Sequence, residues 1–518
     1  MEDTLIKLNR LYAQIKKVNN DLLAISNSKD YENASFEDAM MLTISSNGLS
    51  LIKSLFQENT NAITCILNQR NIIESFALAL MNADGDITPQ QLELFKEQYA
   101  IIEYQQYDET DKEIFKDLND FKDLKRRYFK ARQHFLDAGV SEKVFTKISQ
   151  SRAPFLLDPD FNFNKIIKKY ISDEMNNMYS RLSVFVHPRA YQMIESNEYL
   201  IESSNIVIGL LITLFKDKDP GDNLGYFEES RLIYGFDIDS DLNYGKRLFD
   251  YQKKEWESIL RIVNAFEEVY SKGSYPAMFF KDLTLVLHDI NTDSQLGLTE
   301  NAKMKFKVVS EMFAVFDKIY FSQIDASYLT KLFELHEKIN YEVVCGDEYD
   351  NKKRTIAFDI YKNTFPETQL TKNQFIKEYK RPLGYLINKE GKSPGFNKLV
   401  RDYYSSLQFG KIKDSEIDFE RLYRLMYKES QAMSHGSGYL YFTNTGAWQD
   451  DINVVVALDR FMYSLIFKIK SLFGVFKEDS TNNLKIYNCL EKELNELDSI
   501  FEKKFQILSS VQRIKKNF

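Results

Sequence analysis

The chain has 518 residues, too many for one ordinary hydrophobic core, so we expect about two to four domains. Its 19 Gly and 9 Pro are few, and this scarcity favours long helices over the frequent turns of a β-sandwich. The net charge of -8 argues against a protein that is coated with nucleic acid through bulk attraction.

Sequence signatures of several common classes are missing. The three Cys are far apart, which indicates neither a disulfide framework nor a zinc knuckle and fits a reducing, cytoplasmic location. The N-terminal residues mix acids with bases, and the longest apolar run is about half as long as a bilayer requires, so we expect neither a secretory signal nor a membrane partner. No P-loop, Rossmann glycine pattern, HExxH or GxSxG motif occurs, and two Asp-rich loops lack the EF-hand register. We therefore predict no metal and no cofactor.

Residues 1–216 predict a first helical unit. Apolar residues recur at helical spacing in 3–27 and 48–81, which indicates a pair of packed helices. A charged, aromatic-rich stretch follows, and a later helix is expected to end or kink at Pro188. An apolar helix that begins near Ile206 closes this unit.

The rest of the chain predicts a linker, a second unit and a terminal helix. Residues 217–272 begin with Asp, Gly and Asn in clusters typical of turns, and we expect a linker and a bridging helix there. The second unit spans 273–474, and 475–518 form an amphipathic helix with apolar residues between charges. Long helices of the second unit are expected near 301–320, 326–344 and 419–434.

An ungapped repeat indicates that the second unit is a copy of the first. Five residues recur 248 positions later: Met178, Tyr179, His187, Tyr191 and Asn205 are matched by Met426, Tyr427, His435, Tyr439 and Asn453. Each Asn is followed by an apolar run, so the match extends into an expected core helix. The sequence therefore predicts an all-α protein of two homologous helical bundles that arose by internal duplication, with the C-terminal helix added.

Both copies place polar residues where a core helix would be apolar. Tyr179, Ser183 and His187 share one helix face because they are spaced i, i+4 and i+8. Upstream, Arg70 and Glu74 form a cation–carboxylate pair one turn apart. The corresponding residues expected in the second unit are Lys338, Glu342, Tyr427 and His435.

The first-copy pattern resembles a bacterial phage-defence-associated helical domain family of unknown function, which is marked by Arg-x-x-x-Glu followed by Tyr-x-x-Leu-Ser-x-x-x-His. It is similar, more distantly, to the HEPN ribonucleases, whose mark is an Arg followed a few residues later by a His, as in Arg181 and His187. Leu182 departs from this motif, which usually has a polar residue there. In the second copy, the residues aligned with Arg181 and Ser183 are Glu429 and Gln431.

This resemblance implies an effector of antiphage, abortive-infection-type defence that cleaves RNA without a metal. His187 would move a proton at the ribose hydroxyl or the leaving oxygen, and Arg181 would stabilise charge on the phosphate. Tyr179, Arg70 and Glu74 would orient these two residues. RNA is then the expected partner, and a phage protein, a neighbouring-gene product or a second copy of the chain are the other candidates.

A basic helix offers a candidate surface for RNA. Lys122, Arg126 and Lys130 are spaced i, i+4 and i+8 with aromatic residues between them, which is typical of a face that contacts phosphates. The alternative interpretation is an ordinary solvated helix surface.

Other interpretations of the duplicated motif stay open. The polar residues can form a buried network that fixes the register of the helices without catalysis, in which case function lies with the C-terminal helix and its partner. The chain can also be a non-catalytic sensor or scaffold that binds a ligand or a protein through duplicated polar pockets.

Overall fold

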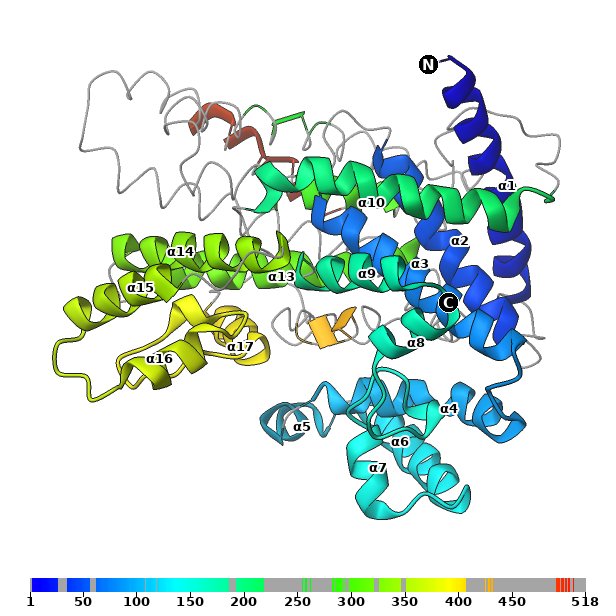
Figure 1. Ribbon diagram of the computed structural model, residues 1–518, viewed down its shortest axis with the longest axis horizontal. Helices are drawn as coiled ribbons and strands as arrows, with labels where there is room; N and C mark the ends of the chain where they lie inside the picture. The colour runs from blue at the N-terminus through cyan, green and yellow to red at the C-terminus, as the bar shows by residue number, and fades with distance from the viewer. Residues whose placement is uncertain are drawn as a thin grey trace. The chain divides into compact units, whose positions relative to one another are not determined.

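The computed structural model describes residues 2–26, 35–55, 62–107, 109–117, 119–185, 192–218, 298–320, 326–345 and 351–406, with single positions within 254–293, 424–431 and 491–506. Every regular element in this part of the chain is a helix, so the predicted all-α class is confirmed (Figure 1). None of the helices among these residues has the length and apolar character needed to cross a bilayer.

The chain forms two compact units. One comprises Met1–Tyr226 and Lys303–Thr445, and the other comprises Phe227–Ala302 and Gly446–Phe518. Most of the second half of the sequence therefore shares a unit with the first half, whereas the sequence predicted separate bundles at 1–216 and 273–474. Buried polar contacts join the two halves, such as the bond of 3.1 Å from Lys305 Nζ to Ser50 Oγ.

In the described part of the chain, α1, α2, α3 and α10 pack together into the bundle that holds the Arg70–Glu74 pair. α2 and α3 pack against each other, α1 covers α2, and α10 covers α3 (Figure 1). The apolar segment predicted at 48–81 is divided between α2 and α3. Both helices are buried nearly all round, so their polar residues bond to one another, as Asn68 Nδ2 does to Ser50 Oγ at 2.9 Å. The helices are α1 (Glu2–Ser26), α2 (Phe36–Leu55), α3 (Ala62–Ala83) and α10 (Gln192–Phe215).

A lobe with an aromatic core follows α3. Thr88 begins its first helix with a capping box to Gln91, which satisfies backbone N–H groups at the helix start. Tyr128 stacks on Tyr104 with ring centroids 4.2 Å apart, so α6 is held against α4 while its outer face stays in solvent. The elements are α4 (Pro89–Gln105), α5 (Glu109–Phe115), α6 (Asn119–Asp137), α7 (Glu142–Ile148), the 3-10 turn η2 (Pro154–Leu156) and α8 (Phe163–Tyr170).

The motif helix of the first copy is α9 (Asp173–Phe185), which packs against α3 and α8. Ser172 Oγ accepts the backbone N–H of Met175 at 3.0 Å, and two acidic residues in the first turn suit the positive end of the helix dipole. The predicted helix end at Pro188 lies outside the described residues.

Helices of the second half follow the sequence expectation closely. α13 (Thr299–Tyr320) and α14 (Ala326–Cys345) confirm the predictions near 301–320 and 326–344, and the described positions within 424–431 are helical. In the predicted C-terminal helix, the described positions within 491–506 are helical too. The remaining elements are α15 (Asn351–Thr364), α16 (Lys372–Tyr379), the 3-10 turn η3 (Gly384–Leu386) and α17 (Phe396–Ser406).

A buried ion pair ties segment 424–431 to the lobe of the first half. Lys428 Nζ lies 2.9 Å from an Asp111 carboxylate oxygen on α5 and donates to the Gln106 carbonyl at 2.7 Å. Both charged side chains are almost fully buried, so each compensates a charge that would otherwise be costly to remove from water.

Candidate functional site

The carboxylate of Glu74 is the centre of the first-copy site. It lies on α3 one turn after Arg70, whose Nε donates to Glu74 Oε1 at 2.9 Å. The side chains are 3% and 0% exposed for Arg70 and Glu74, respectively, so the pair sits inside the bundle. The predicted pairing of these two residues is therefore present, and it is buried.

Tyr179 of α9 completes the contact between the two motif helices. Its hydroxyl donates to Glu74 Oε1 at 2.6 Å, and the guanidinium carbon of Arg70 lies 5.7 Å from the centre of its ring. Tyr179 is itself buried, so α9 is held to α3 by a hydrogen bond and a cation–π contact out of water. The sequence placed these three residues together correctly.

Arg152 is a fourth member that the sequence analysis did not identify. It precedes η2, and its NH1 lies 3.1 Å from Glu74 Oε1 and 3.4 Å from the Tyr179 hydroxyl. With 36% of its side chain exposed, Arg152 connects the buried carboxylate to the surface. Helical periodicity cannot reveal such a residue because it lies in an irregular segment between helices.

The cluster concentrates charge away from water. Burial raises the pKa of the Glu74 carboxyl, and the charge of Arg70 and the Tyr179 hydroxyl offset part of this effect. Burial also raises the pKa of the Tyr179 phenol, with the Glu74 charge adding to the shift. Glu74 Oε2 and an Arg70 NH2 group have no hydrogen-bond partner among the described residues. The buried ion pair of Arg70 and Glu74 therefore keeps one donor group and one acceptor oxygen without a hydrogen bond to the described residues.

The second-copy tyrosine contacts a different carboxylate from the one predicted. Tyr427 donates to Glu311 Oε1 of α13 at 3.4 Å, and Lys307 lies one turn before Glu311 on that helix. All three residues are buried. The predicted cation, Lys338, is exposed on α14, and the side chain of Glu342 lies outside the described residues.

The two predicted catalytic residues of the first copy are only partly described. Arg181 is exposed, whereas Tyr179 two positions earlier is buried, because residues two apart on a helix point about 200° apart. Ser183 lies one turn after Tyr179, and its hydroxyl is buried without a hydrogen-bond partner among the described residues. His187 and His435 lie outside the described residues.

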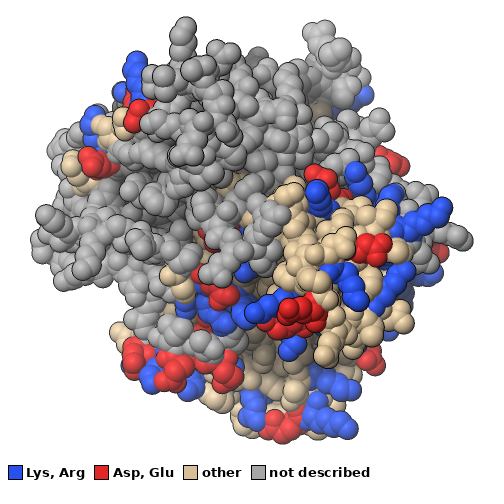
Figure 2. Space-filling view, turned by 90° about the vertical axis from the view of Figure 1, so that its left-hand side faces the viewer, with Lys and Arg blue, Asp and Glu red and all other residues tan. Residues whose placement is uncertain are grey.

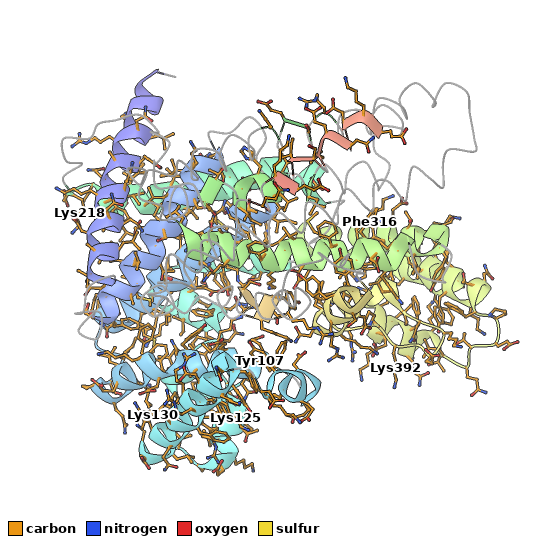
Figure 3. All side chains as sticks on the ribbon, turned by 180° about the vertical axis from the view of Figure 1, so that it is seen from behind. Tyr107, Lys125, Lys130, Lys218, Phe316 and Lys392 are labelled. Carbon is orange, nitrogen blue, oxygen red and sulfur yellow. The ribbon has the colours of Figure 1, made fainter. Side chains whose placement is uncertain are left out.

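The predicted RNA face on α6 is exposed, but the set of lysines and arginines on it that make no ion pair within the described part of the chain differs from the predicted set. Lys122, Arg126 and Lys130 all reach solvent, but Arg126 is paired with Asp123 at 2.5 Å. Lys125 lies on the same face and, like Lys122 and Lys130, makes no ion pair with a described residue. Figure 3 labels Lys125 and Lys130 on this lobe, well separated from Lys392.

The α6 face also carries an aromatic ring. Phe129 is 50% exposed, and among the described residues it is the one aromatic side chain with such exposure. On the face drawn in Figure 2, acidic and basic side chains are interspersed over the described surface. The α6 face combines exposed lysines with an exposed aromatic ring.

Among the described residues, no group of three or more His, Cys, Asp or Glu side chains is arranged to hold a metal ion. No family model, curated protein or solved structure matches the chain. Family membership is therefore not established, and the resemblance of the motif to phage-defence domains and HEPN ribonucleases stays a prediction.

Proposed function

We propose that the chain is an antiphage effector that cleaves RNA without a metal, using Arg181 and His187 of the first copy. The observation that carries this proposal is the placement of α9. Tyr179 anchors this helix to a buried carboxylate, while Arg181 two residues later faces solvent. A cation held on a firmly packed helix is suited to receive an RNA phosphate, because positioning before the reaction lowers its barrier.

In this proposal the buried cluster positions α9 and does not touch RNA. Arg70 and Glu74 are too deeply buried to reach a polynucleotide, so they act through the helix that Tyr179 fixes. This matches the orienting role that the motif resemblance implies for them. The residues of the first-copy motif that contact RNA are Arg181 and His187.

The chemistry needs one base and one acid around a phosphodiester. His187 takes the proton from the ribose 2′-hydroxyl, the 2′-oxygen forms a bond to phosphorus, and the bond from phosphorus to the 5′-oxygen breaks. The leaving oxygen takes a proton from a general acid, which gives a 2′,3′-cyclic phosphate and a 5′-hydroxyl. Arg181 stabilises the negative charge that grows on the phosphoryl oxygens.

The α6 face supplies binding in the same proposal. Lys122, Lys125 and Lys130 are free to neutralise phosphates, and Phe129 offers a ring on which an unpaired base can stack. The sequence placed Arg126 in this set too. Its charge is partly neutralised by the ion pair with Asp123, so it contributes less to phosphate binding. This combination fits single-stranded RNA better than a duplex, whose bases are already stacked.

Cleavage of RNA in the presence of a chelator tests the catalytic part. Wild type should cleave, and Arg181→Ala and His187→Ala should each lose at least about 100-fold in rate, the scale of an acid–base or charge-stabilising residue. The control is Lys392→Ala, an exposed lysine away from α6. Equal loss in the control, or full activity in both variants with unchanged melting temperatures, contradicts the assignment.

RNA binding is tested separately from cleavage. Replacing Lys122, Lys125 and Lys130 by Ala should reduce the slope of log affinity against log salt by about 2, because single strands release about 0.7 counterions per phosphate contact. The matched control replaces Lys362, Lys377 and Lys392, which are also exposed. If both triple variants lower the affinity for RNA equally, the α6 face has no special role.

The interpretation of the motif as a purely structural network has one observation in its favour. The nearly complete burial of Arg70 and Glu74 is what a network that fixes helix packing requires, whether or not RNA is cleaved. A chain of this kind would show no nuclease activity, and its function would lie with the C-terminal helix and its partner. Absence of RNA cleavage by the wild type, together with a large fall in melting temperature for Glu74→Gln, would favour this alternative.

A further inference from the structure

We infer that the second half builds its own anchoring site from Lys307, Glu311 and Tyr427, and that this site positions the helical segment leading to His435. His435 is the candidate for the general acid that the proposed ribonuclease step requires, so its role rests on that proposed function. The site itself rests on contacts that can be tested without any activity.

The first support is the register between α3 and α13. The motif cation and carboxylate of α3 recur on α13 at 237 positions further along, with the same spacing of four. Four neighbouring positions agree in character as well, and others, such as Asn71 with Val308 and Ile73 with Ser310, do not. The matched pairs are Leu67 and Met304, Arg70 and Lys307, Ile72 and Val309, Glu74 and Glu311, Phe76 and Phe313, and Ala77 and Ala314.

The second support is the equivalence of the two tyrosine contacts. Tyr179 donates to Glu74 at 2.6 Å, and Tyr427, which matches Tyr179 in the ungapped repeat, donates to Glu311 at 3.4 Å. Two different criteria, sequence alignment and contact, therefore select the same carboxylate.

The order of elements before each tyrosine is also shared. In the first half α7, η2 and α8 precede α9, and in the second half α16, η3 and α17 precede segment 424–431. Ser141 and Thr371 cap α7 and α16, and each is followed four residues later by a buried Phe. α8 and α17 both begin with the sequence Phe-Asn-Lys. These parallels support the duplication as well as the second site.

The two sites lie close together because α3 and α13 meet inside the unit. Asn68 and Lys305, which are equivalent in the register, both donate to Ser50 Oγ, at 2.9 and 3.1 Å. Asn71 Nδ2 lies 2.8 Å from Met304 Sδ. Burial lowers the pKa of Lys307, the Glu311 charge opposes this, and the charge of Arg70 adds to the lowering, as expected of neighbouring buried cations.

A double-mutant cycle on the full chain tests the site. Tyr427→Phe and Glu311→Gln are small changes, and urea unfolding of the two single variants and the double variant gives their coupling. We expect the two changes to be non-additive by about fivefold or more in the unfolding equilibrium constant, as for residues in contact. Lys338→Ala, which alters the cation predicted from sequence, should leave the constant unchanged.

Additive effects in the cycle, or destabilisation by Lys338→Ala as large as that by Lys307→Met, would overturn the second site. RNA cleavage then examines its role: Tyr427→Phe should lower kcat with little change in KM, because a displaced helix misplaces His435 without removing an RNA contact. An unchanged kcat would remove the positioning role of the site. Coupling in a wild type that cleaves no RNA would refute the ribonuclease proposal and leave the anchoring cluster intact.

Discussion

The clusters around Glu74 and Glu311 solve the same packing problem with different chemistry. In each, a buried carboxylate accepts a tyrosine hydroxyl, and a second donor reaches that hydroxyl. The second donor is the charged Arg152 in the first cluster and the neutral amide of Gln431 in the other, at 3.4 and 2.9 Å. Gln431 aligns with Ser183 of the first copy. The sequence suggested that this position had lost the motif, but Gln431 contacts the Tyr427 hydroxyl. If the two halves are copies, as we propose, Gln431 is a changed residue that still contacts the matched tyrosine.

The cations differ in a way that matters for stability. An arginine guanidinium such as that of Arg70 stays protonated in folded proteins. Burial lowers the pKa of Lys307, so its ammonium loses a proton more easily. Loss of the carboxylate leaves Arg70 as an uncompensated buried charge. Loss of the carboxylate beside Lys307 can be relieved by deprotonation.

The largest expected effect follows from this difference. Glu74→Ala should lower the free energy of unfolding by about 3–5 kcal/mol, the cost of breaking a buried ion pair from one side. Glu311→Ala should cost less. Urea denaturation of both variants measures this, with the exposed Glu93→Ala as a control that should change little. Equal losses at the two carboxylates would show that lysine deprotonation gives no relief.

Removal of the tyrosine hydroxyls should have an intermediate effect. Tyr179→Phe loses a short bond to a carboxylate, for which we expect about 1.5–3 kcal/mol, and Tyr427→Phe loses a longer one, for which we expect about 1 kcal/mol. Thermal or urea unfolding of the two variants gives the ratio. A greater loss for Tyr427→Phe would reverse the order that the two distances imply.

The smallest effect should come from restoring the first-copy residue in the second copy. Gln431→Ser removes the amide that donates to the Tyr427 hydroxyl and to Asn397, and the expected loss is about 0.5 kcal/mol. In a Tyr427→Phe background the same change should cost less, because one of its acceptors is already absent. An identical cost in both backgrounds would separate Gln431 from the cluster.

Much of the fold could be predicted because the helices have clear periodic patterns of apolar residues in the sequence. Apolar spacing and scarce Gly and Pro indicated the helices that became α13 and α14. Helical spacing placed Arg70 and Glu74 one turn apart on one helix, and the motif resemblance grouped Tyr179 with them; the three residues are in contact in the structure.

The missing parts of the site have physical causes. A cation and a carboxylate four apart occur on many helices, so Lys338 and Glu342 satisfied the pattern as well as Lys307 and Glu311 did. The apolar residues around the two pairs match those around Arg70 equally well, so the contact from Tyr427 to Glu311 is what separates them. Arg152 acts from an irregular segment, where no periodic signal exists.

The buried pair of Lys428 and Asp111 bears on how the protein is made. These residues are 317 positions apart, so this ion pair can form only after residue 428 has been synthesised. The contact between α5 and segment 424–431 is therefore completed late. A nascent chain that stops within the first half lacks this buried contact of the lobe.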